Sequence, residues 1–367
     1  MIFIGWLKTA EMSQDLRFAL IGCGRVSPKH IASLKEIEGA RLVAICDKDL
    51  EKAKTRGEGL DGVEYIQDYK ELLKREDIDV VNVLTESGTH ADITIEAAKA
   101  GKHVVVEKPM ALTLRDADRM IRECDQNGVK LFVVKQNRFN LPVVKLREAL
   151  EEGRFGKMVM GTVRVRWCRT QEYYDQDPWR GTWALDGGVF TNQASHHIDL
   201  LEWMMGDVES VFAKSTTRLV DTETEDTGVA VLKFTNGALG IIEATTATRP
   251  KDLEGSISVM GSGGTVEIGG FAVNEMKVWN FAQEEPGDTQ VLERYHTNPP
   301  DVYGFGHLEY LRSVVDCIQG NGKALVDGLE GRRSLELINA IYESAETGKE
   351  VRLNFVPRYS RLGKSEA

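Results

Sequence analysis

The sequence predicts an α/β protein in which a doubly wound parallel sheet comes first and an α+β half with a mostly antiparallel open sheet follows. Strand-like and helix-like segments alternate as far as about residue 140. From about residue 155, longer segments alternate apolar and polar residues instead. The length of 367 residues exceeds the usual size of one compact core, so we expect two domains.

Composition excludes several classes of protein. Apolar residues make up 42% and charged residues 28%, as is usual for globular proteins, and a net charge of −11 argues against a nucleic-acid partner. No stretch is long enough to span a bilayer, and the apolar start, residues 1–7, lacks the basic flank and cleavage site of a signal peptide. The 5 cysteines are scattered, which fits a reducing compartment. We therefore expect a cytoplasmic protein without a membrane partner.

The first strand, residues 16–21, leads into a glycine-rich turn. The turn and the residues after it read Gly22-Cys23-Gly24-Arg25-Val26-Ser27, a G-x-G-x-x-G pattern with serine in the third small position. The first glycine permits the tight turn, and the second lets the backbone approach a pyrophosphate. A helix starting at Pro28 completes the unit. A flexible turn also explains such a motif when it stands alone.

The next strand sharpens that interpretation. Residues 41–46 are mostly apolar and end at Asp47. A carboxylate at this point accepts hydrogen bonds from an adenosine ribose and repels a 2′-phosphate. The pair of motifs predicts a Rossmann domain that prefers NAD to NADP.

The alternation then continues without a break. We predict helices over residues 69–75, 91–100 and 113–127, and strands over residues 79–84, 102–107 and 129–134. Thr113 and Asp116 have the spacing of a capping box at the start of the third helix.

The strand over residues 102–107 carries the most informative residue. Its three consecutive valines predict a strand buried on both faces, and it ends in Glu107-Lys108-Pro109. Ligands of open parallel sheets bind beyond the carboxyl ends of the strands, which is where Lys108 lies. A strand-end lysine that only reaches for water is the structural alternative.

The second half is predicted from its alternating segments. The strands expected there cover residues 158–167, 211–217, 228–234, 238–246, 256–260 and 265–268. Asn236-Gly237 predicts a hairpin, and Gly261-Ser262-Gly263-Gly264 another reversal. One face of such a sheet is often left for a partner subunit, so we expect a homodimer or homotetramer. Helices over residues 308–319 and 330–347 are long enough to return to the first domain.

We divide the chain accordingly into an extension, two domains and a tail. The extension covers residues 1–15, the NAD-binding domain 16–140, the α+β domain for substrate and oligomerisation 141–355, and the tail 356–367.

A second polar stretch lies within the second half. Asn192, His196 and Asp199 share one face if this segment is helical. A lone histidine on such a helix is more often a hydrogen-bonded structural residue, and too few ligands stand at metal spacing to predict a metal site. A histidine paired with a lysine, however, is what alcohol oxidation needs, because one group accepts the hydroxyl proton while the other stabilises the alkoxide.

These motifs together resemble the glucose–fructose oxidoreductase / inositol dehydrogenase / rhizopine-catabolism (Gfo/Idh/MocA) family. The resemblance covers residues 16–355 and is carried by the glycine turn, residues 85–90, Glu107-Lys108-Pro109 and the Asn192 to Asp199 segment. It implies an NAD-dependent dehydrogenase of a sugar, cyclitol or related alcohol. Lys108 and His196 would be catalytic. Many members carry aspartate where this chain has Asn192, so this amide would position substrate and His196 would be the base.

The resemblance also implies the binding residues. Cofactor contacts would come from Gly22, Gly24, Arg25, Val26, Asp47, Thr85, His90, Glu107, Lys108, Gln136, Trp179 and Arg180. Substrate contacts would come from Lys108, Arg166, Asn192 and His196.

Three further stretches look like the branch of the family that oxidises UDP-N-acetylglucosaminuronic acid at C3 for surface polysaccharide synthesis. They cover residues 135–140, 179–183 and 303–307. A diphosphate with a uronate is strongly anionic, and arginines cluster on or after the first strand of the second half; they are Arg164, Arg166, Arg169 and Arg180. A solvated strand face explains the same arginines.

Three alternatives remain open at this point. A methyltransferase can use a glycine turn and an acid after the second strand, but it gives no reason for Glu107-Lys108-Pro109. A non-catalytic dinucleotide-binding regulator can share the fold, although it needs neither Lys108 nor His196. The same scaffold could also oxidise a neutral cyclitol such as inositol.

Overall fold

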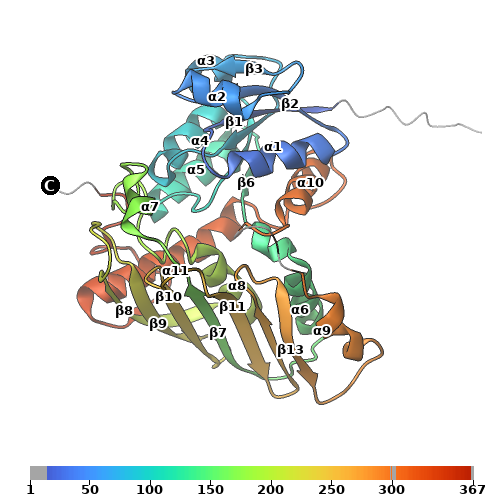
Figure 1. Ribbon diagram of the computed structural model, residues 1–367, viewed down its shortest axis with the longest axis vertical. Helices are drawn as coiled ribbons and strands as arrows, with labels where there is room; N and C mark the ends of the chain where they lie inside the picture. The colour runs from blue at the N-terminus through green and yellow to red at the C-terminus, as the bar shows by residue number, and fades with distance from the viewer. Residues whose placement is uncertain (1–14, 298, 300–302, 365–367) are drawn as a thin grey trace, which may run out of the picture.

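The computed structural model describes residues 15–297, 299 and 303–364, and these residues build two sheets. A six-stranded sheet lies in the upper half of Figure 1 and an eight-stranded sheet in the lower half. Of the expected N-terminal extension, all but Asp15 lies outside the described residues, as do residues 365–367 of the tail.

The first sheet is parallel throughout. Its strand order is β3-β2-β1-β4-β5-β6. The strands are β1 (Leu16–Ile21), β2 (Ala40–Cys46), β3 (Glu64–Ile66), β4 (Val80–Val83), β5 (His103–Val106) and β6 (Leu131–Val133). This is the strand order of a dinucleotide-binding Rossmann domain. The predicted doubly wound sheet is therefore confirmed.

Helices cover both faces of this sheet. They are α1 (Ser27–Glu36), α2 (Leu50–Arg56), α3 (Tyr69–Leu73), α4 (His90–Lys99) and α5 (Leu114–Gln126). The valine run of β5 is fully buried, and Thr113 accepts the backbone N–H of Asp116 as the capping box predicts. The sequence analysis missed β3 and α2. In α2 only Ala53 is buried, so this helix has no apolar face to recognise.

The second sheet has the order β13-β12-β11-β7-β10-β9-β8-β14. Its strands are β7 (Met158–Arg166), β8 (Val208–Thr216), β9 (Thr227–Phe234), β10 (Leu239–Thr245), β11 (Glu254–Gly261), β12 (Gly264–Gly269), β13 (Glu275–Phe281) and β14 (Val351–Arg352). Only β7 and β10 pair in parallel, so the mostly antiparallel sheet is confirmed. Asn236 and Gly237 join β9 to β10 as predicted. β13 and β14 were not predicted.

Helices also connect the two sheets. The remaining ones are α6 (Leu141–Glu151), α7 (Gln171–Asp175), α8 (Ser195–Met205), α9 (Val291–Arg294), α10 (His307–Ile318) and α11 (Gly328–Thr347), with single 3₁₀ turns η1 (Ser87–Thr89), η2 (Gln136–Phe139) and η3 (Asp288–Gln290). In Figure 1, α8 and α11 lie between the larger sheet and the Rossmann half. α10 packs against α1, and α11 packs against α5 and β6. The domain boundaries themselves stay a prediction.

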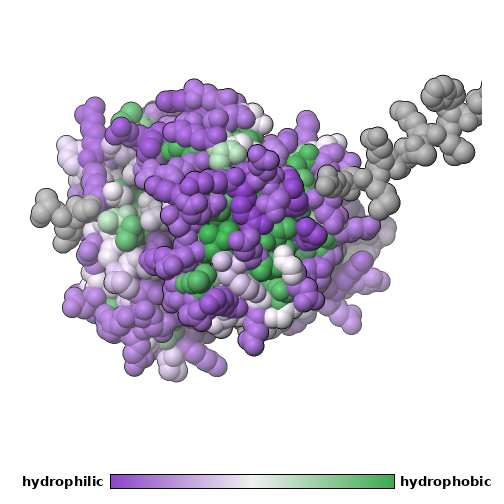
Figure 2. Space-filling model, turned by 90° about the horizontal axis from the view of Figure 1, so that it is seen from above, coloured by the Kyte–Doolittle hydropathy of each residue, from purple (hydrophilic) through white to green (hydrophobic). Residues whose placement is uncertain are grey.

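Two surfaces differ in character. The face seen from above in Figure 2 is mostly hydrophilic, and apolar residues show only in small areas between polar side chains. The open face of the larger sheet, in contrast, exposes apolar side chains at Phe212, Val229, Val231, Leu239 and Met260. Among the helices of the described residues, none has the length and apolar composition that crossing a bilayer requires.

The expected tail is not a loose end where it is described. Leu362 is buried in the core of the second half, and the backbone N–H of Gly363 donates to the carbonyl oxygen of Trp183. Glu343 of α11 accepts three successive backbone N–H groups, from residues 358 to 360. Residues 356–364 therefore pack onto the second half.

Candidate active site

A cavity of about 2560 Å³ runs along the carboxyl ends of the Rossmann strands and reaches the second sheet. Its lining includes every residue that the sequence assigned to cofactor or substrate, namely Gly22, Gly24, Arg25, Val26, Asp47, Thr85, His90, Glu107, Lys108, Gln136, Arg166, Trp179, Arg180, Asn192 and His196. The structure thus brings all of these residues to one place, and their individual roles stay predictions.

The glycine turn has the shape that a dinucleotide requires. Gly22 has a φ of +101°, and a Cβ there would lie 2.7 Å from the carbonyl carbon of Leu84, so only glycine fits. A Cβ on Gly24 would meet nothing closer than 3.9 Å, which leaves open space above the turn. No side chain caps α1, and no acidic residue lies in its first turn. The helix N-terminus is therefore suited to bind a phosphate.

Asp47 is held ready for a ribose at the end of β2. One of its carboxylate oxygens accepts the backbone N–H of Cys23 at 2.8 Å, and the other accepts that of Asp49 at 2.9 Å. Each oxygen keeps a free lone pair for a hydroxyl group. Together, the turn, the uncapped helix and this carboxylate fit NAD.

Aromatic and arginine side chains meet at the edge of the cavity. The Arg25 guanidinium, from the glycine turn, lies 5.0 Å from the centre of the Tyr173 ring and hydrogen-bonds Gln176 in the segment after α7. Arg180 stacks on Tyr173 and Trp179 and pairs with Asp177. The contacts of Arg25 join the Rossmann half to the segment that follows β7, beside the place where a cofactor would lie.

Lys108 reaches from the end of β5 toward the second half of the chain. Its Nζ donates to the backbone carbonyl oxygen of Asn192 at 2.6 Å. Burial lowers the pKa of Lys108, while the carboxylates of Glu107 and Asp186 act in the opposite direction. Burial thus favours the neutral amine, which is the form that can accept a proton and serve as a base.

His196, in the first turn of α8, is neutral. Burial and the charge of Lys108 hold its pKa well below the usual value. Its Nε2 lies 3.0 Å from the side-chain amide nitrogen of Gln136, and its Nδ1 has no hydrogen-bond partner among the described residues. With that amide as donor, Nε2 is the acceptor and the ring proton sits on Nδ1, so the nitrogen without a partner is an N–H donor.

The sequence-based placement of Asn192 is wrong in one respect. Asn192 does not share a helix with His196, because α8 begins at Ser195. Gly187 has a φ of +86°, and the backbone N–H of Asn192 donates to the carbonyl oxygen of Gly188, so residues 187–194 form an irregular turn. The side chain of Asn192 donates to Asp186. Asn192 nevertheless lines the cavity with Lys108 and His196.

His90 and Glu107 support the loops that carry these groups. The two ring nitrogens of His90 lie 2.8 Å and 3.0 Å from the carbonyl oxygens of Pro109 and Thr85. Glu107 accepts the backbone N–H of Lys108 and lies 3.0 Å from the ring of His30. Burial acts to raise the pKa of Glu107, but His30, His307 and the charge of Lys108 hold it at about 2. Both side chains thus fix the end of β5.

Glu107 also belongs to the one group of the described residues whose ligand atoms lie close enough for a metal ion. The others are His30 and His307. The amide nitrogen of Asn82 lies 3.0 Å from Nδ1 of His30. With that amide as donor, the ring proton sits on Nε2 and points at Glu107, so hydrogen bonding accounts for the pair. The expectation that the protein has no metal stays a prediction.

Arg166 lies at the cavity, but its charge is already compensated. Along β7 the buried valines face the core, so Arg164 and Arg166 point to the open face of the sheet. Arg166 pairs with Glu243 of β10 and Glu254 of β11. Arg164 does not line the cavity. The arginines that the sequence analysis grouped together therefore provide less unpaired positive charge than their number suggested.

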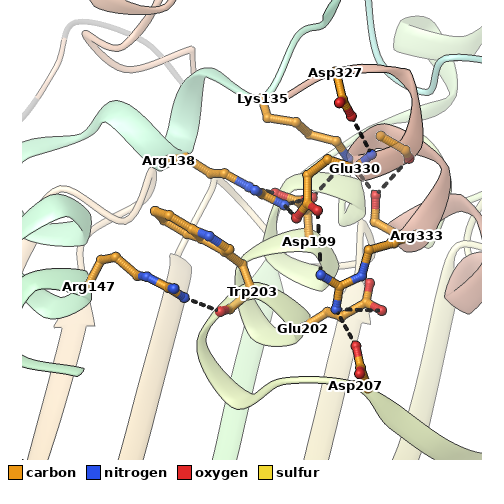
Figure 3. A network of polar contacts seen from close by, with 12 residues as sticks. Lys135, Arg138, Arg147, Asp199, Glu202, Trp203, Asp207, Asp327, Glu330 and Arg333 are labelled. Carbon is orange, nitrogen blue, oxygen red and sulfur yellow. Dashed lines mark hydrogen bonds and ion pairs between the residues drawn. The ribbon is translucent and has the colours of Figure 1, made fainter. Parts of the chain in front are cut away.

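A buried ion network fixes the segment that carries Gln136. Figure 3 shows Lys135 and Arg138 converging on Asp199 of α8, with Glu330 of α11 beside them. Arg138 binds Asp199 through two hydrogen bonds of 2.8 Å. Burial acts to raise the pKa of Asp199, but the charges of Arg138 and Lys135 outweigh it and keep this pKa below its usual value. The sequence placed Asp199 near His196 but did not predict this partner.

Sequence reasoning missed two residues of the site. Tyr173 lines the cavity and packs against both Arg25 and Arg180. Asp186 is buried, hydrogen-bonds Asn192 and acts on the pKa of Lys108. An aspartate before two glycines suggests only a turn, so the sequence offered no signal for its role.

Comparison with known proteins agrees with this geometry. A family model described as the NAD-binding Rossmann fold of the Gfo/Idh/MocA oxidoreductase family matches residues 16–135, and the C-terminal alpha/beta domain of the same family matches residues 147–353. The chain belongs to this family.

Several characterised relatives cover nearly the whole chain. The myo-inositol 2-dehydrogenase of Thermotoga maritima is 32% identical over 93% of this chain and 99% of its own. The crystal structure of the WlbA dehydrogenase from Bordetella pertussis, in complex with NADH and UDP-GlcNAcA, is 44% identical with a TM-score of 0.89, covering 93% of this chain and 99% of that one. The WlbA dehydrogenase from Chromobacterium violaceum, with the same two ligands, is 41% identical with a TM-score of 0.87, covering 94% and 97%.

These matches confirm the predicted family, the cofactor NAD and the enzyme class, an oxidoreductase acting on a CH–OH group. A methyltransferase and a non-catalytic regulator are no longer needed to explain the glycine turn. This Gfo/Idh/MocA protein is an NAD-dependent dehydrogenase, and its substrate is the open question.

Proposed function

We propose that this dehydrogenase oxidises C3 of UDP-N-acetylglucosaminuronic acid to a ketone. The similarity to the two WlbA structures, both with UDP-GlcNAcA and NADH bound, carries this proposal. The three stretches that look like that branch, residues 135–140, 179–183 and 303–307, include Gln136, Trp179, Arg180 and Tyr303, which line the cavity.

In the proposed mechanism, Lys108 and His196 remove the hydroxyl proton. NAD supplies the hydride acceptor when it is bound along the glycine turn. Because its pKa is lowered, Lys108 can lose its proton and accept one from the substrate. Neutral His196 would share that proton at Nε2, in place of the Gln136 amide that hydrogen-bonds this nitrogen in the structure. The amide of Asn192, which cannot take a proton, orients the hydroxyl group through a hydrogen bond.

The cavity lining suits a ligand that carries negative charge. Although the chain is strongly acidic as a whole, the lining contains as many lysine and arginine side chains as aspartate and glutamate side chains. The lysines and arginines of the lining include Arg169, Arg180, Lys251 and Lys277, of which Arg169 pairs with Asp252, Arg180 with Asp177 and Lys277 with Glu275. A diphosphate and a uronate would be bound by such groups.

A neutral cyclitol is the second candidate. The relative from Thermotoga maritima is named myo-inositol 2-dehydrogenase, and the compensated charge of Arg166 would suit an uncharged substrate. The two candidates need the same catalytic pair and differ in the groups that bind the rest of the substrate.

We also propose that the protein assembles through the open face of the larger sheet. The exposed apolar side chains of β8, β9 and β10 lie in register there, since Phe212 pairs with Val231, and Val231 with Ile241. Such a face is typical of a surface covered by a second copy. Light scattering should give the mass of a dimer or tetramer, and Val231→Lys should reduce it. A monomeric wild-type protein would rule out this assembly.

The substrate is tested by following nicotinamide absorbance with purified protein. NAD⁺ is added with UDP-N-acetylglucosaminuronic acid, with UDP-N-acetylglucosamine as a control that lacks only the carboxylate, or with myo-inositol. We expect reduction with the first compound alone. Reduction with myo-inositol alone would support the second candidate and refute the first.

A further inference from the structure

Asp186 is a buried carboxylate next to the proposed catalytic lysine. It is 1% exposed, and it is not among the residues that line the cavity. One of its oxygens accepts the backbone N–H of Gly181 at 2.8 Å, and the other accepts the side-chain amide of Asn192. Asp186 thus ties two separate points of the turn that precedes α8.

Through Asn192 this carboxylate is connected to Lys108. The side chain of Asn192 is held by Asp186, while its backbone carbonyl oxygen accepts the Lys108 amine at 2.6 Å. The hydroxyl of Ser195 donates to the same carbonyl oxygen at 3.4 Å. The position of the amine therefore depends on a peptide that Asp186 fixes.

The charges around Lys108 give Asp186 a second influence. Burial lowers the pKa of the amine; the carboxylates of Glu107 and Asp186 act to raise it, and the cations of Lys135 and Arg180 act to lower it. The Glu107 carboxylate already has His30 and the backbone N–H of Lys108 as partners. Asp186 forms no ion pair within 4.0 Å among the described residues. Burial raises its pKa to about 6, and the charges of Arg180 and Lys108 act in the opposite direction.

We propose that Asp186 is a positioning residue for Lys108. Asp186 holds the Asn192 peptide against the Lys108 amine, and its carboxylate supplies a negative charge on the other side of that peptide. The inference rests on the proposed function of Lys108 as proton acceptor. It assigns to Asp186 a part in catalysis without contact with substrate or cofactor.

The first test is Asp186→Asn in the full-length enzyme. Asparagine keeps the size of the side chain and one acceptor oxygen for the Gly181 N–H. The side-chain amide of Asn192 can turn its oxygen toward the new amide nitrogen, so the turn should persist. Loss of the negative charge should lower the pKa of Lys108, because the ammonium form loses a favourable interaction. We expect the pH at which kcat rises to move down by roughly one unit, and kcat at the optimum to fall about tenfold.

An exchange variant tests the positioning. Asn192→Asp alone should be severely impaired, since it places two carboxylates against each other. Asp186→Asn combined with Asn192→Asp restores one carboxylate and one amide to the same hydrogen bond, and it should recover most of the lost kcat. Failure of the double variant to improve on the single ones would overturn the positioning role.

Glu225→Gln is the matched control. Glu225 is also buried below this turn and accepts the backbone N–H of Phe190 and the hydroxyl of Tyr342. The charge of Asp186 acts on the pKa of Glu225, but Glu225 is not among the main influences on the pKa of Lys108. Glu225→Gln should lower kcat or the stability of the fold without moving the pH at which kcat rises. An equal shift in Glu225→Gln and Asp186→Asn would mean a structural effect only.

A readout without turnover separates this inference from the proposed function. Lysine side chains can be labelled by reductive methylation, and the Lys108 signal can be assigned by its loss in Lys108→Arg and titrated by NMR. In Asp186→Asn the Lys108 midpoint should lie at lower pH than in the wild type, whatever the substrate is. An unchanged midpoint would refute the inference even if the dehydrogenase activity were established.

Discussion

The amine of Lys108 lies 2.6 Å from the carbonyl oxygen of Asn192, so a residue at the end of β5 in the Rossmann half contacts the turn before α8 in the second half. Both residues line the cavity that the two halves share. His196 lines the same cavity, and the charge of Lys108 acts on the pKa of its ring.

Lys108→Ala should lower kcat by two to four orders of magnitude, because it removes the proposed proton acceptor. Binding of NAD, measured by fluorescence titration, should change little, since the glycine turn and Asp47 are untouched. Lys99→Ala, at the exposed end of α4, is the control and should behave as the wild type. Near-normal turnover in Lys108→Ala would refute the assignment.

Gly22→Ala should abolish NAD binding and destabilise the fold by several kcal/mol, because its Cβ would clash with the backbone of Leu84. Gly59→Ala is matched to it, since Gly59 also has a positive φ, of +76°, but nothing lies within 4 Å of its added Cβ. That variant should lose only about 1 kcal/mol. Urea unfolding and NAD titration on both variants measure the difference, and equal losses would contradict the steric argument.

Glu202 should make the protein less stable as the pH rises. Burial raises its pKa to about 7 in the folded state, and the carboxylates of Asp199 and Glu330 add to the effect. A carboxyl whose pKa is higher in the folded state than in the unfolded state stabilises the fold at pH values below its unfolded pKa. For Glu202 this contribution is lost as the pH rises from about 4.5 to about 7. Glu202→Gln should therefore gain up to about 3 kcal/mol over the wild type near pH 8 and little near pH 4. Urea unfolding of both proteins at pH 4 and pH 8 measures the free energies of unfolding. The same difference between Glu202→Gln and the wild type at both pH values would contradict the prediction.

Removal of metal should leave the activity unchanged. Within the group of His30, Glu107 and His307, hydrogen bonds to Glu107 and Asn82 already occupy both ring nitrogens of His30. Dialysis against a chelator should not alter kcat, and elemental analysis should find no stoichiometric metal. Activity lost to the chelator and restored by zinc would reveal a metal site there.

The sequence predicted the Rossmann sheet well because its signals are local. The valine run of β5, the glycine turn after β1 and the acid after β2 each report on their own backbone. The short and polar α2 and the edge strands β3, β13 and β14 give no such signal, and all four were missed.

The site was predicted as a set of residues but not as a set of contacts. Lys108 and His196 could be recognised because their neighbours in sequence form motifs. The partners that decide their environment come from distant segments: Arg166 is compensated by β10 and β11, Arg138 binds Asp199, and Asp186 holds Asn192. Long-range pairs of this kind depend on the tertiary fold, which a single sequence does not display.

The most direct test of the account is the change in nicotinamide absorbance when UDP-N-acetylglucosaminuronic acid is added to the purified protein with NAD⁺. We predict reduction that depends on this substrate, does not occur with UDP-N-acetylglucosamine, and disappears in Lys108→Ala. Reduction with myo-inositol and none with the nucleotide sugar would contradict the proposed substrate. Reduction that persists undiminished in Lys108→Ala would contradict the proposed mechanism.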